Sequence, residues 1–371
     1  MAWSAYSLSL FSPAGVFVCP ITTQTGLTYA RAVNQAGSAT ITLPYTDAVW
    51  NAAVRNSILE IWRRGERGGM KRALGAVWFL NKGSIVLDSQ GAWTMQLSFA
   101  DQIDLLNRQI VNDPYSSATA QKYQLPAETI MKQVVSNELI TRSGLGSYIA
   151  IEPDSARGYA TISIICSYQS VASVCQQVCQ ASTQYGSYLA FDLEPQGPLS
   201  YVFRVYPNQR GTDRSAGSSQ PLILSPQGGT VGTGTYAKDY SSIATRIIAA
   251  GQTTAGDPTT QTVTDANLEA SGGPFGITEQ FASIQNTADY GTIATQANQA
   301  LRKARPMLSF TGGIIQTPGC EFGVDFDYGD LITVQFRSNL AIPVRLEGMS
   351  VSLDGTGMET ITANMAYQST S

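Results

Sequence analysis

The sequence predicts a β-rich α+β fold with two antiparallel β-barrels, a small α/β domain and an insertion rich in Gly, Ser and Thr. Three observations lead to this prediction. Between Val324 and Met365, three runs of alternating apolar and polar residues follow one another, as expected for strands with one buried face. The turn Asp354-Gly355-Thr356-Gly357 separates the last two runs, and glycine tolerates the positive φ of a hairpin. About the first 110 residues carry a comparable pattern.

The first β-module is expected to span residues 1–111. Alternating runs predict strands over residues 6–11, 15–21, 27–32, 39–43, 58–63, 74–80, 84–88 and 93–99, the first four as an antiparallel meander. Short helices are expected over residues 47–54 and 100–111. The stretch from Arg63 to Arg72 is a basic cluster, which we interpret as a solvated hairpin tip. A phosphate contact and a loop that docks on a neighbouring subunit are the alternatives.

Residues 112–200 are predicted to form a peripheral α/β domain. A helix is expected over residues 126–141, because proline suits the first turn of a helix and apolar residues follow at helical spacing. A strand over residues 159–167, a helix over 171–185 and strands over 188–193 and 199–206 complete a β-α-β-β order.

The second β-module is expected to combine residues 201–250 with residues 306–371. Within it, residues 208–234 read as loop and residues 242–248 as a strand. Residues 251–305 are predicted to be an insertion, made of a mobile Gly-rich loop over 251–276 and a helix over 284–305 with a face of small residues. Pro306 is expected to end that helix.

The composition excludes several classes of function. The 371 residues contain no histidine, which removes Ser-His-Asp and Cys-His nucleophile systems and the usual zinc and iron sites. Only 13% of residues are charged and the net charge is −4, so no basic surface suited to nucleic acid is expected. No basic segment followed by an apolar one opens the chain and no apolar run reaches membrane-spanning length, so we expect a cytosolic product without a membrane anchor.

The five cysteines are interpreted as buried thiols in a reducing compartment. They are Cys19, Cys166, Cys175, Cys179 and Cys320, an odd number with no Cys-x-x-Cys pair. Cys175 and Cys179 lie four residues apart on a predicted helix and could place two metal ligands side by side, but the chain has no histidine to complete such a site.

Three groups of polar residues are candidate chemical sites. Asp192 and Glu194 share one face of a predicted strand at roughly 6 to 7 Å, a spacing compatible with acid and base roles in glycoside hydrolysis; a solvated strand end is the default interpretation. Asp325, Asp327 and Asp330 resemble a calcium loop without its bidentate Glu, so a hairpin with a polar edge is preferred. Residues 228–234 form a Gly-rich pattern without the Lys-Ser/Thr of a phosphate loop. We therefore predict no catalytic, cofactor-binding or metal-binding residue, no cofactor, and no enzymatic activity.

The order of several short segments resembles a known family. Tyr6-Ser-Leu-Ser-Leu-Phe, Leu27-Thr-Tyr-Ala-Arg-Ala-Val-Asn-Gln-Ala-Gly-Ser, Ile41-Thr-Leu-Pro, Ile58-Leu-Glu-Ile-Trp-Arg-Arg and Leu97-Ser-Phe-Ala-Asp follow one another as in the N-terminal domain of tail-tip or baseplate hub proteins of long-tailed bacteriophages. An alanine-rich helix ending near Ala304, the segment Tyr328-Gly-Asp-Leu-Ile-Thr-Val and the final hairpin are similar to the second barrel of that family.

The resemblance implies a structural role. In the family, three copies form a ring in which two tube-like barrels per subunit present six similar positions to the hexameric tail tube and threefold symmetry to a tip fibre or plug. The implied partners are the tail tube, distal tail and tape measure proteins, in a virion tail assembled in the host bacterial cytoplasm. Double-stranded DNA would pass through without specific binding, so we expect an acidic channel wall with few Lys or Arg.

Two other functions stay open at this stage. The first is a carbohydrate-binding or cell-wall-degrading tail protein that uses Asp192 and Glu194. The second is an effector-spike protein of a contractile injection machine, which shares the double-barrel plan.

Overall fold

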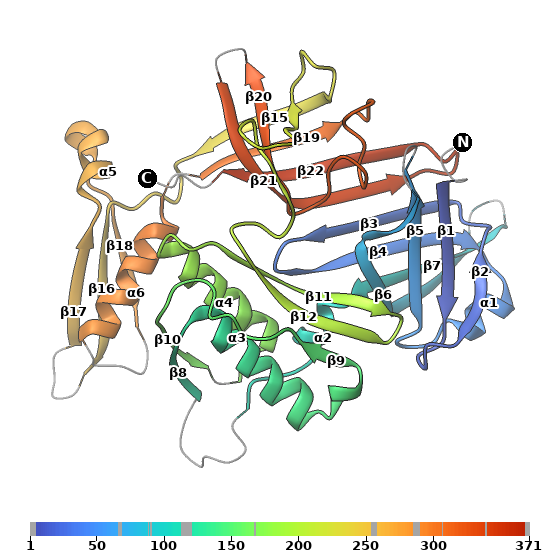
Figure 1. Ribbon diagram of the computed structural model, residues 1–371, viewed down its shortest axis with the longest axis horizontal. Helices are drawn as coiled ribbons and strands as arrows, with labels where there is room; N and C mark the ends of the chain where they lie inside the picture. Colours follow the sequence, from blue (N-terminus) through green and yellow to red (C-terminus); the bar gives the residue numbers. More distant parts are fainter. Residues whose placement is uncertain are drawn as a thin grey trace.

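The computed structural model describes residues 5–65, 69–87, 89, 91–112, 121–166, 168–253, 258–284, 290–305, 307–337 and 340–367. Antiparallel β-sheet dominates this part of the chain, which confirms the β-rich prediction. In Figure 1 the strands from both ends of the chain lie together at the top and right, the α/β part lies below them, and a small sheet with its helices lies at the left.

The largest sheet contains fourteen strands of the described residues, in the order β15-β19-β22-β21-β3-β4-β7-β6-β5-β1-β2 with β13, β14 and β20 beside it. The N-terminal strands are β1 (Tyr6–Phe11), β2 (Phe17–Ile21), β3 (Gly26–Ala32), β4 (Gln35–Pro44), β5 (Ile58–Arg64), β6 (Met70–Leu87) and β7 (Trp93–Asp101). The C-terminal strands are β13 (Asp213–Arg214), β14 (Ile223–Leu224), β15 (Val231–Asp239), β19 (Met307–Ile314), β20 (Leu331–Arg337), β21 (Leu340–Leu353) and β22 (Glu359–Tyr367).

The two predicted β-modules share this one sheet. β21 pairs with β3 in an antiparallel register that runs from Leu353↔Leu27 to Gly348↔Ala32. Leu8, Tyr29, Leu97, Val351 and Met365 belong to a single buried core on one face, so apolar side chains from both ends of the chain pack together.

The prediction of two closed barrels is not confirmed. In the described residues the sheet ends at β15 on one side and β2 on the other, and these strands do not pair with each other. The physical reason is that alternation of apolar and polar residues fixes which face of a strand is buried, but leaves open which strand lies at each edge.

Several predicted elements of the first module differ from the structure. Residues 6–43 do not form a meander, because the β1–β2 and β3–β4 hairpins lie in separate parts of the sheet. Residues 84–87 continue the long strand β6, and the predicted helix over 100–111 is reduced to α2 (Asp104–Asn107) because β7 extends to Asp101. The short helix α1 (Asp47–Ala52) and the turn at 354–357 are confirmed.

The predicted helices and strands of the α/β part are present, together with two short strands over residues 121–125 and 149–151 that are not predicted. The helices are α3 (Ala127–Val135), a π-helical turn over Ser136–Arg142, a 3₁₀ turn over Leu145–Ser147 and α4 (Val171–Gln184); the strands are β8 (Gln121–Leu125), β9 (Ile149–Ile151), β10 (Ile162–Cys166), β11 (Leu189–Gly197) and β12 (Ser200–Pro207). Ser170 caps α4 by accepting a hydrogen bond from the N–H of Ser173 at 3.1 Å. The apolar sides of α3 and α4 pack in one cluster with Ile58, Val77 and Phe79, so the α/β part covers the region of the sheet formed by β5 and the first half of β6.

A second small unit lies between β15 and β19 in the chain. β16 (Arg246–Thr253) pairs with β17 (Pro258–Thr264) and β18 (Glu279–Ser283), and α6 (Tyr290–Lys303) packs on them through Ile293, Ala297 and Leu301. A helix α5 (Ala266–Ser271) and a 3₁₀ turn over Gly273–Phe275 fall where a loop over 251–276 is predicted. Residues 254–257 and 285–289 and Pro306 lie outside the described residues.

Candidate functional site

One strand arrangement occurs twice in the molecule. β6 pairs with β7 through its C-terminal half and with β5 through its N-terminal half. β21 pairs with β22 and β20 in the same way. In addition, β4 lies between β3 and β7, as β19 lies between β15 and β22. The series β3, β4, β5, β6, β7 is therefore repeated by β15, β19, β20, β21, β22.

The position of a β-bulge and a short sequence match give the same residue alignment of these repeats. Both long strands carry a bulge, between Leu80 and Lys82 in β6 and between Leu346 and Gly348 in β21. Setting Lys82 equivalent to Gly348 and following the paired residues across each repeat makes Thr28 equivalent to Thr235. The residues there read Thr-Tyr-Ala-Arg in β3 and Thr-Tyr-Ala-Lys in β15.

Sequence reasoning missed this signature. Four similar residues are too few to be recognised without the pairing that aligns them. The finding supports the expectation of two related modules, although both are built into one sheet.

The face of the sheet opposite the buried core, from β15 to the second half of β6, carries mostly short, uncharged side chains. We call it the bare face. Its residues, assigned from the register, are Lys82, Ser84, Val86, Thr94, Gln96, Ser98, Ala100, Ser38, Thr40, Thr42, Thr28, Ala30, Ala32, Gly348, Ser350, Ser352, Thr360, Thr362, Asn364, Thr311, Gly313, Thr235, Ala237 and Asp239. Apart from Gly348, all are exposed or half-buried. Lys82 and Asp239 are the two charged residues in this set.

Both ends of this eight-stranded stretch have a free edge within the described residues. β15 pairs with β19 on one side and ends the sheet on the other. β5 pairs with β6 between Met70 and Phe79, so Lys82–Leu87 has a partner strand in β7 alone. Unpaired backbone N–H and C=O groups at such edges are ready to pair with another chain.

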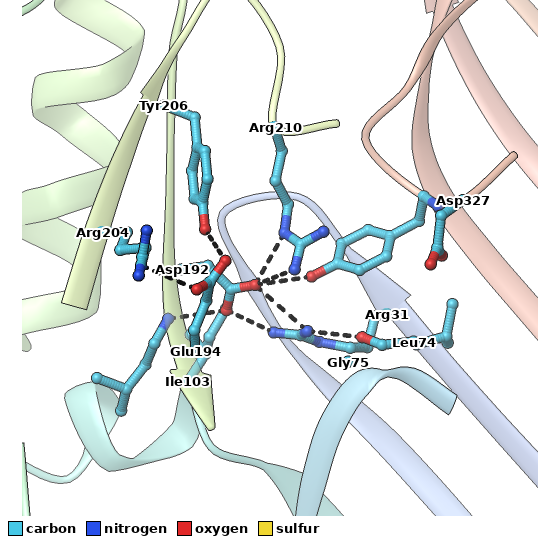
Figure 2. A network of polar contacts seen from close by, with 12 residues as sticks. Arg31, Leu74, Gly75, Ile103, Asp192, Glu194, Arg204, Tyr206, Arg210 and Asp327 are labelled. Atoms are coloured by element: carbon cyan, nitrogen blue, oxygen red, sulfur yellow. Dashed lines mark hydrogen bonds and ion pairs between the residues drawn. The ribbon is translucent and has the colours of Figure 1, made fainter. Parts of the chain in front are cut away.

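The two repeats and the α/β part meet at a buried polar group that we call the joint: Arg31, Asp101, Asp192, Arg210 and Tyr328. The Arg31 guanidinium donates to Asp101 at 2.6 Å and to Asp192 at 2.8 Å, and it also donates to the carbonyl oxygen of Leu74. Arg210 and the Tyr328 hydroxyl donate to the other oxygen of Asp192, at 2.8 and 2.9 Å. Figure 2 shows Asp192 between Arg31 and Arg210.

The charges of the joint compensate one another. Burial alone would raise the pKa of Asp192, but Arg31 and Arg210 outweigh that effect and hold the pKa well below its usual range. Burial raises the pKa of Asp101, although Arg31 opposes the shift. Two guanidiniums thus face two carboxyl groups in a site closed to water, and their hydrogen bonds fix how β3, β11 and the residues after β12 sit together.

A second contact joins the repeats at the other end of the core. Arg63 on β5 forms two hydrogen bonds of 2.8 Å to the carboxylate of Glu359 at the start of β22, and Tyr6 donates to the same carboxylate. Arg63 also donates to the carbonyl oxygen of Phe322 at 2.8 Å. Burial would raise the pKa of Glu359, but the bonds from Arg63 outweigh it and lower the pKa.

The structure changes the interpretation of Asp192 and Glu194. The default of a solvated strand end is wrong for Asp192, which is fully buried in the joint. Glu194 is half-buried and pairs with Arg204 at 2.9 Å, while Tyr206 donates to it. A carboxylate held between two arginines with a lowered pKa has no access to a sugar and does not donate a proton near neutral pH. This geometry does not suit the pair for glycoside hydrolysis.

The other predicted polar groups have local roles. Asp325 accepts from the N–H of Glu321, and Asp330 accepts from the N–H groups of Thr212 and Asp327, so these carboxylates hold turns together. In the described residues no group of His, Cys, Asp and Glu has an arrangement that could hold a metal ion. Within the Gly-rich pattern of residues 228–234, the expected loop gives way to β15 from Val231 onward, paired with β19.

The flanks of the basic cluster are solvated only in part: Arg64 and Lys71 are exposed, whereas Arg63 and Arg72 are half-buried. Arg63 binds Glu359, Arg72 binds Glu60 at 2.8 Å, and Lys71 donates to the carbonyl oxygen of Gly323. Residues 66–68 lie outside the described residues.

Four of the five cysteines are buried and none forms a disulfide, which confirms buried thiols at those positions; Cys19 is half-buried. Burial raises the pKa of Cys320 to about 11 and that of Cys166 to about 12. No helix of the described residues is both long and apolar enough to cross a bilayer.

A family model that covers nearly the whole chain identifies its class, a family of siphovirus proteins. The chain belongs to the siphovirus ReqiPepy6 Gp37-like protein family, whose sequence model matches residues 10–365. A search of curated proteins finds no significant match.

Solved structures support the class. A tail protein from Neisseria meningitidis MC58 superposes with a TM-score of 0.61 at 13% identity, covering 98% of this chain and 97% of the other. The 43 kDa tail protein of prophage MuSo2 from Shewanella oneidensis gives 0.61 at 14% identity, with 97% and 98% covered. The prophage tail protein gp18 from Listeria monocytogenes EGD-e gives 0.55 at 11% identity, with 96% and 94% covered. The resemblance to tail proteins of long-tailed phages is thereby confirmed.

Proposed function

We propose that the protein is the structural hub of the phage tail tip or baseplate, and that three copies close into a ring around the DNA exit channel. The observation that carries this proposal is the eight-stranded antiparallel stretch from β15 to β6, made of two four-stranded repeats and bounded by two free edges. Three such subunits provide six similar positions for a hexameric tail tube and threefold symmetry for a tip fibre or plug.

The strand directions are compatible with closure. Seven successive antiparallel pairings separate β15 from β6, so these two edges run in opposite directions. Rotation about a ring axis would therefore bring β6 of one copy antiparallel to β15 of the next. A closed barrel of three such stretches would be roughly 45–50 Å across between opposite backbones, given a strand spacing of about 4.8 Å and a tilt of about 35–45°. That width accommodates a DNA duplex.

The position and composition of the bare face support the proposal that this face lines the channel. The buried core occupies one face of the sheet, which leaves the bare face to line the ring. Its low content of Lys and Arg agrees with the sequence-based expectation, but its composition is neutral where an acidic wall is expected. Short hydroxyl-bearing side chains without net charge neither attract phosphates nor add strong repulsion, so DNA would slide past without specific binding.

We propose four parts for the chain. Residues 1–111 and residues 201–250 with 306–371 form the two tube-like modules, residues 112–200 form the peripheral α/β part, and residues 251–305 form the insertion. β16 is best counted with the insertion, because it pairs with β17 and β18. In this proposal the protein is not an enzyme. Its contacts are with the tail tube, distal tail and tape measure proteins and with the tip fibre or plug.

The experiment that tests the hub is a mass measurement followed by imaging. Native mass spectrometry of the purified protein, alone and mixed with its tail tube and distal tail proteins, should give a trimer, and class averages should show a ring with a central hole. A protein that stays monomeric in both samples, or a ring with another copy number, would rule out the trimeric hub.

A further inference from the structure

The contact between the two repeats within one chain provides a template for the contact between subunits. This inference rests on the trimeric ring proposed above. Within the chain, the second half of the long strand β21 pairs with β3, the first strand of the other repeat. The equivalent segments are the second half of β6 and the strand β15, and these are the two free edges.

The alignment of the two repeats predicts which residues of β6 and β15 would lie opposite each other between subunits. Gly348–Leu353 of β21 is equivalent to Lys82–Leu87 of β6, because both segments follow the bulge. Leu27–Ala32 of β3 is equivalent to Gly234–Asp239 of β15. Since Gly348 pairs with Ala32 and Leu353 with Leu27, the same geometry sets Lys82 opposite Asp239 and Leu87 opposite Gly234.

We propose that Lys82–Leu87 of one subunit and Gly234–Asp239 of the next form an antiparallel strand pair in the register Lys82↔Asp239, Ser84↔Ala237, Val86↔Thr235. The occupant of each free edge is thus a second copy of this chain.

Charge complementarity supports this register. Lys82 and Asp239 are the two charged residues of the bare face, they lie at its opposite edges, and the register brings them directly opposite each other across the subunit boundary. Opposite charges facing each other in an antiparallel pair are favourable, and like charges are unfavourable. In the described part of one chain neither side chain takes part in an ion pair; Asp239 accepts a hydrogen bond from the N–H of Ser241.

Side-chain size and exposure fit as well. Val86 is 51% exposed in the single chain and would face Thr235 on the same side of the sheet. Ile85 would lie opposite Tyr236, on the core side, as Val351 lies opposite Tyr29 within the chain. The new pair would also satisfy the backbone groups of both edges. With Lys82 and Asp239 paired at each boundary, the wall of the ring has no unpaired charge from this face.

Disulfide trapping tests the register. In a Cys19→Ser background, the pair Ser84→Cys and Ala237→Cys should form a disulfide between subunits under mild oxidation, giving covalent dimers and trimers on a denaturing gel. Directly opposite residues lie at a separation that a disulfide can bridge, whereas the diagonal neighbour lies at about 7–8 Å. The matched control, Ser84→Cys with Thr235→Cys, places both thiols on the same face but out of register and should cross-link far more slowly.

Charge reversal tests the pair itself. Lys82→Glu and Asp239→Lys should each raise the concentration needed for half-maximal trimer by about tenfold, because like charges then meet at all three boundaries. The double variant restores opposite charges and should return to within about threefold of the wild type. Both residues are exposed in the single chain, so the circular dichroism and melting of each variant monomer should match those of the wild type.

The outcomes distinguish a failure of the proposed strand register from a failure of the proposed trimeric hub. Rapid cross-linking of Ser84→Cys with Ala237→Cys together with rescue by the double reversal supports the register. A trimer in which the control pair cross-links as fast, or in which the two reversals act additively, overturns the register and leaves the hub standing. Absence of a trimer with and without tail partners overturns both proposals.

Discussion

At the scale of single residues, the most consequential side chain is Asp192. It binds two arginines and one tyrosine, and two of these partners, Arg31 and Tyr328, are 161 and 136 positions away. No local pattern around Phe191-Asp192-Leu193 contains that information, so the sequence suggested an exposed strand end or an acid-base pair. Burial together with the two guanidiniums assigns the residue a structural role.

Replacement of Asp192 by Asn should destabilise the fold strongly. Breaking one side of a buried ion pair leaves a charge without compensation, so we expect a loss of about 3–5 kcal/mol in the free energy of unfolding. The matched control is Glu194→Gln, two residues away on the same strand, where a partly exposed pair should contribute less than about 1 kcal/mol. Urea unfolding followed by tryptophan fluorescence measures both, and equal effects would refute the structural role of Asp192.

The contact between Glu359 and Arg63 should make stability depend on pH. Because the pKa of Glu359 is lower in the folded protein than in the unfolded chain, its contribution is fully present above the unfolded value of about 4.3 and is lost as the pH falls through the folded value. The difference in unfolding free energy between wild type and Glu359→Gln should therefore shrink below about pH 4.

Taking a difference is necessary because buried Asp101, Asp327 and Asp330 have raised pKa values and change stability in the opposite direction. Chemical denaturation of both proteins between pH 3 and pH 7 gives the comparison, and a constant difference over this range would contradict the assignment.

At the scale of elements, the sequence predicts the helices and turns whose signals lie in neighbouring residues. The helix α4 follows a Ser cap, and the turn at 354–357 carries two glycines, so both are correctly located. The pairing of β3 with β21 joins residues more than 300 positions apart and depends on side-chain packing across the core, which alternation does not encode. Because alternation does not encode which strands pair over long distances, it also does not distinguish two closed barrels from one shared sheet.

The β3–β4 hairpin shows how closely the joint is packed. A Cβ at Gly37 would lie 2.5 Å from the carbonyl oxygen of Ala30 and 2.7 Å from Cγ of Arg31. Gly37→Ala should therefore displace Arg31 from Asp101 and destabilise the protein by about 1–3 kcal/mol. Gly217→Ala, where a Cβ would meet no atom within 4 Å, is the control and should stay within about 0.5 kcal/mol of the wild type. Thermal melting of both variants measures the contrast, and equal melting temperatures would argue against tight packing there.

At the scale of the whole molecule, the two repeats and the bare face describe a subunit whose surfaces have different tasks. The core joins both ends of the chain, the α/β part covers β5 and the first half of β6, and the bare face stays open to solvent. The proposed hub needs such a division, because the strand edges must join the subunits while the bare face lets DNA pass.

Positive charge placed on the bare face should slow the passage of DNA. Thr40→Lys combined with Thr311→Lys adds two lysines to each subunit at equivalent positions of the two repeats. We expect slower DNA ejection from assembled virions, with a difference that decreases as the salt concentration rises. The control with Gln at both positions has similar bulk without charge and should eject DNA at the wild-type rate. If the lysine variant also ejects at that rate, the bare face does not line the channel.

The repeats differ in the connection between their first two strands: β3 leads into β4 through a short turn at Val33 and Asn34, whereas the unit from β16 to α6 occupies the equivalent place between β15 and β19. Around a closed assembly, every second position would thus carry an extra folded body on its rim. A partner that recognises the shared strands would engage all positions alike, while one that grips the appended unit would find alternate sites, spaced 120° apart. One internal duplication, with a folded insertion in only one of its two copies, is therefore enough to offer six binding sites to one partner and three to another.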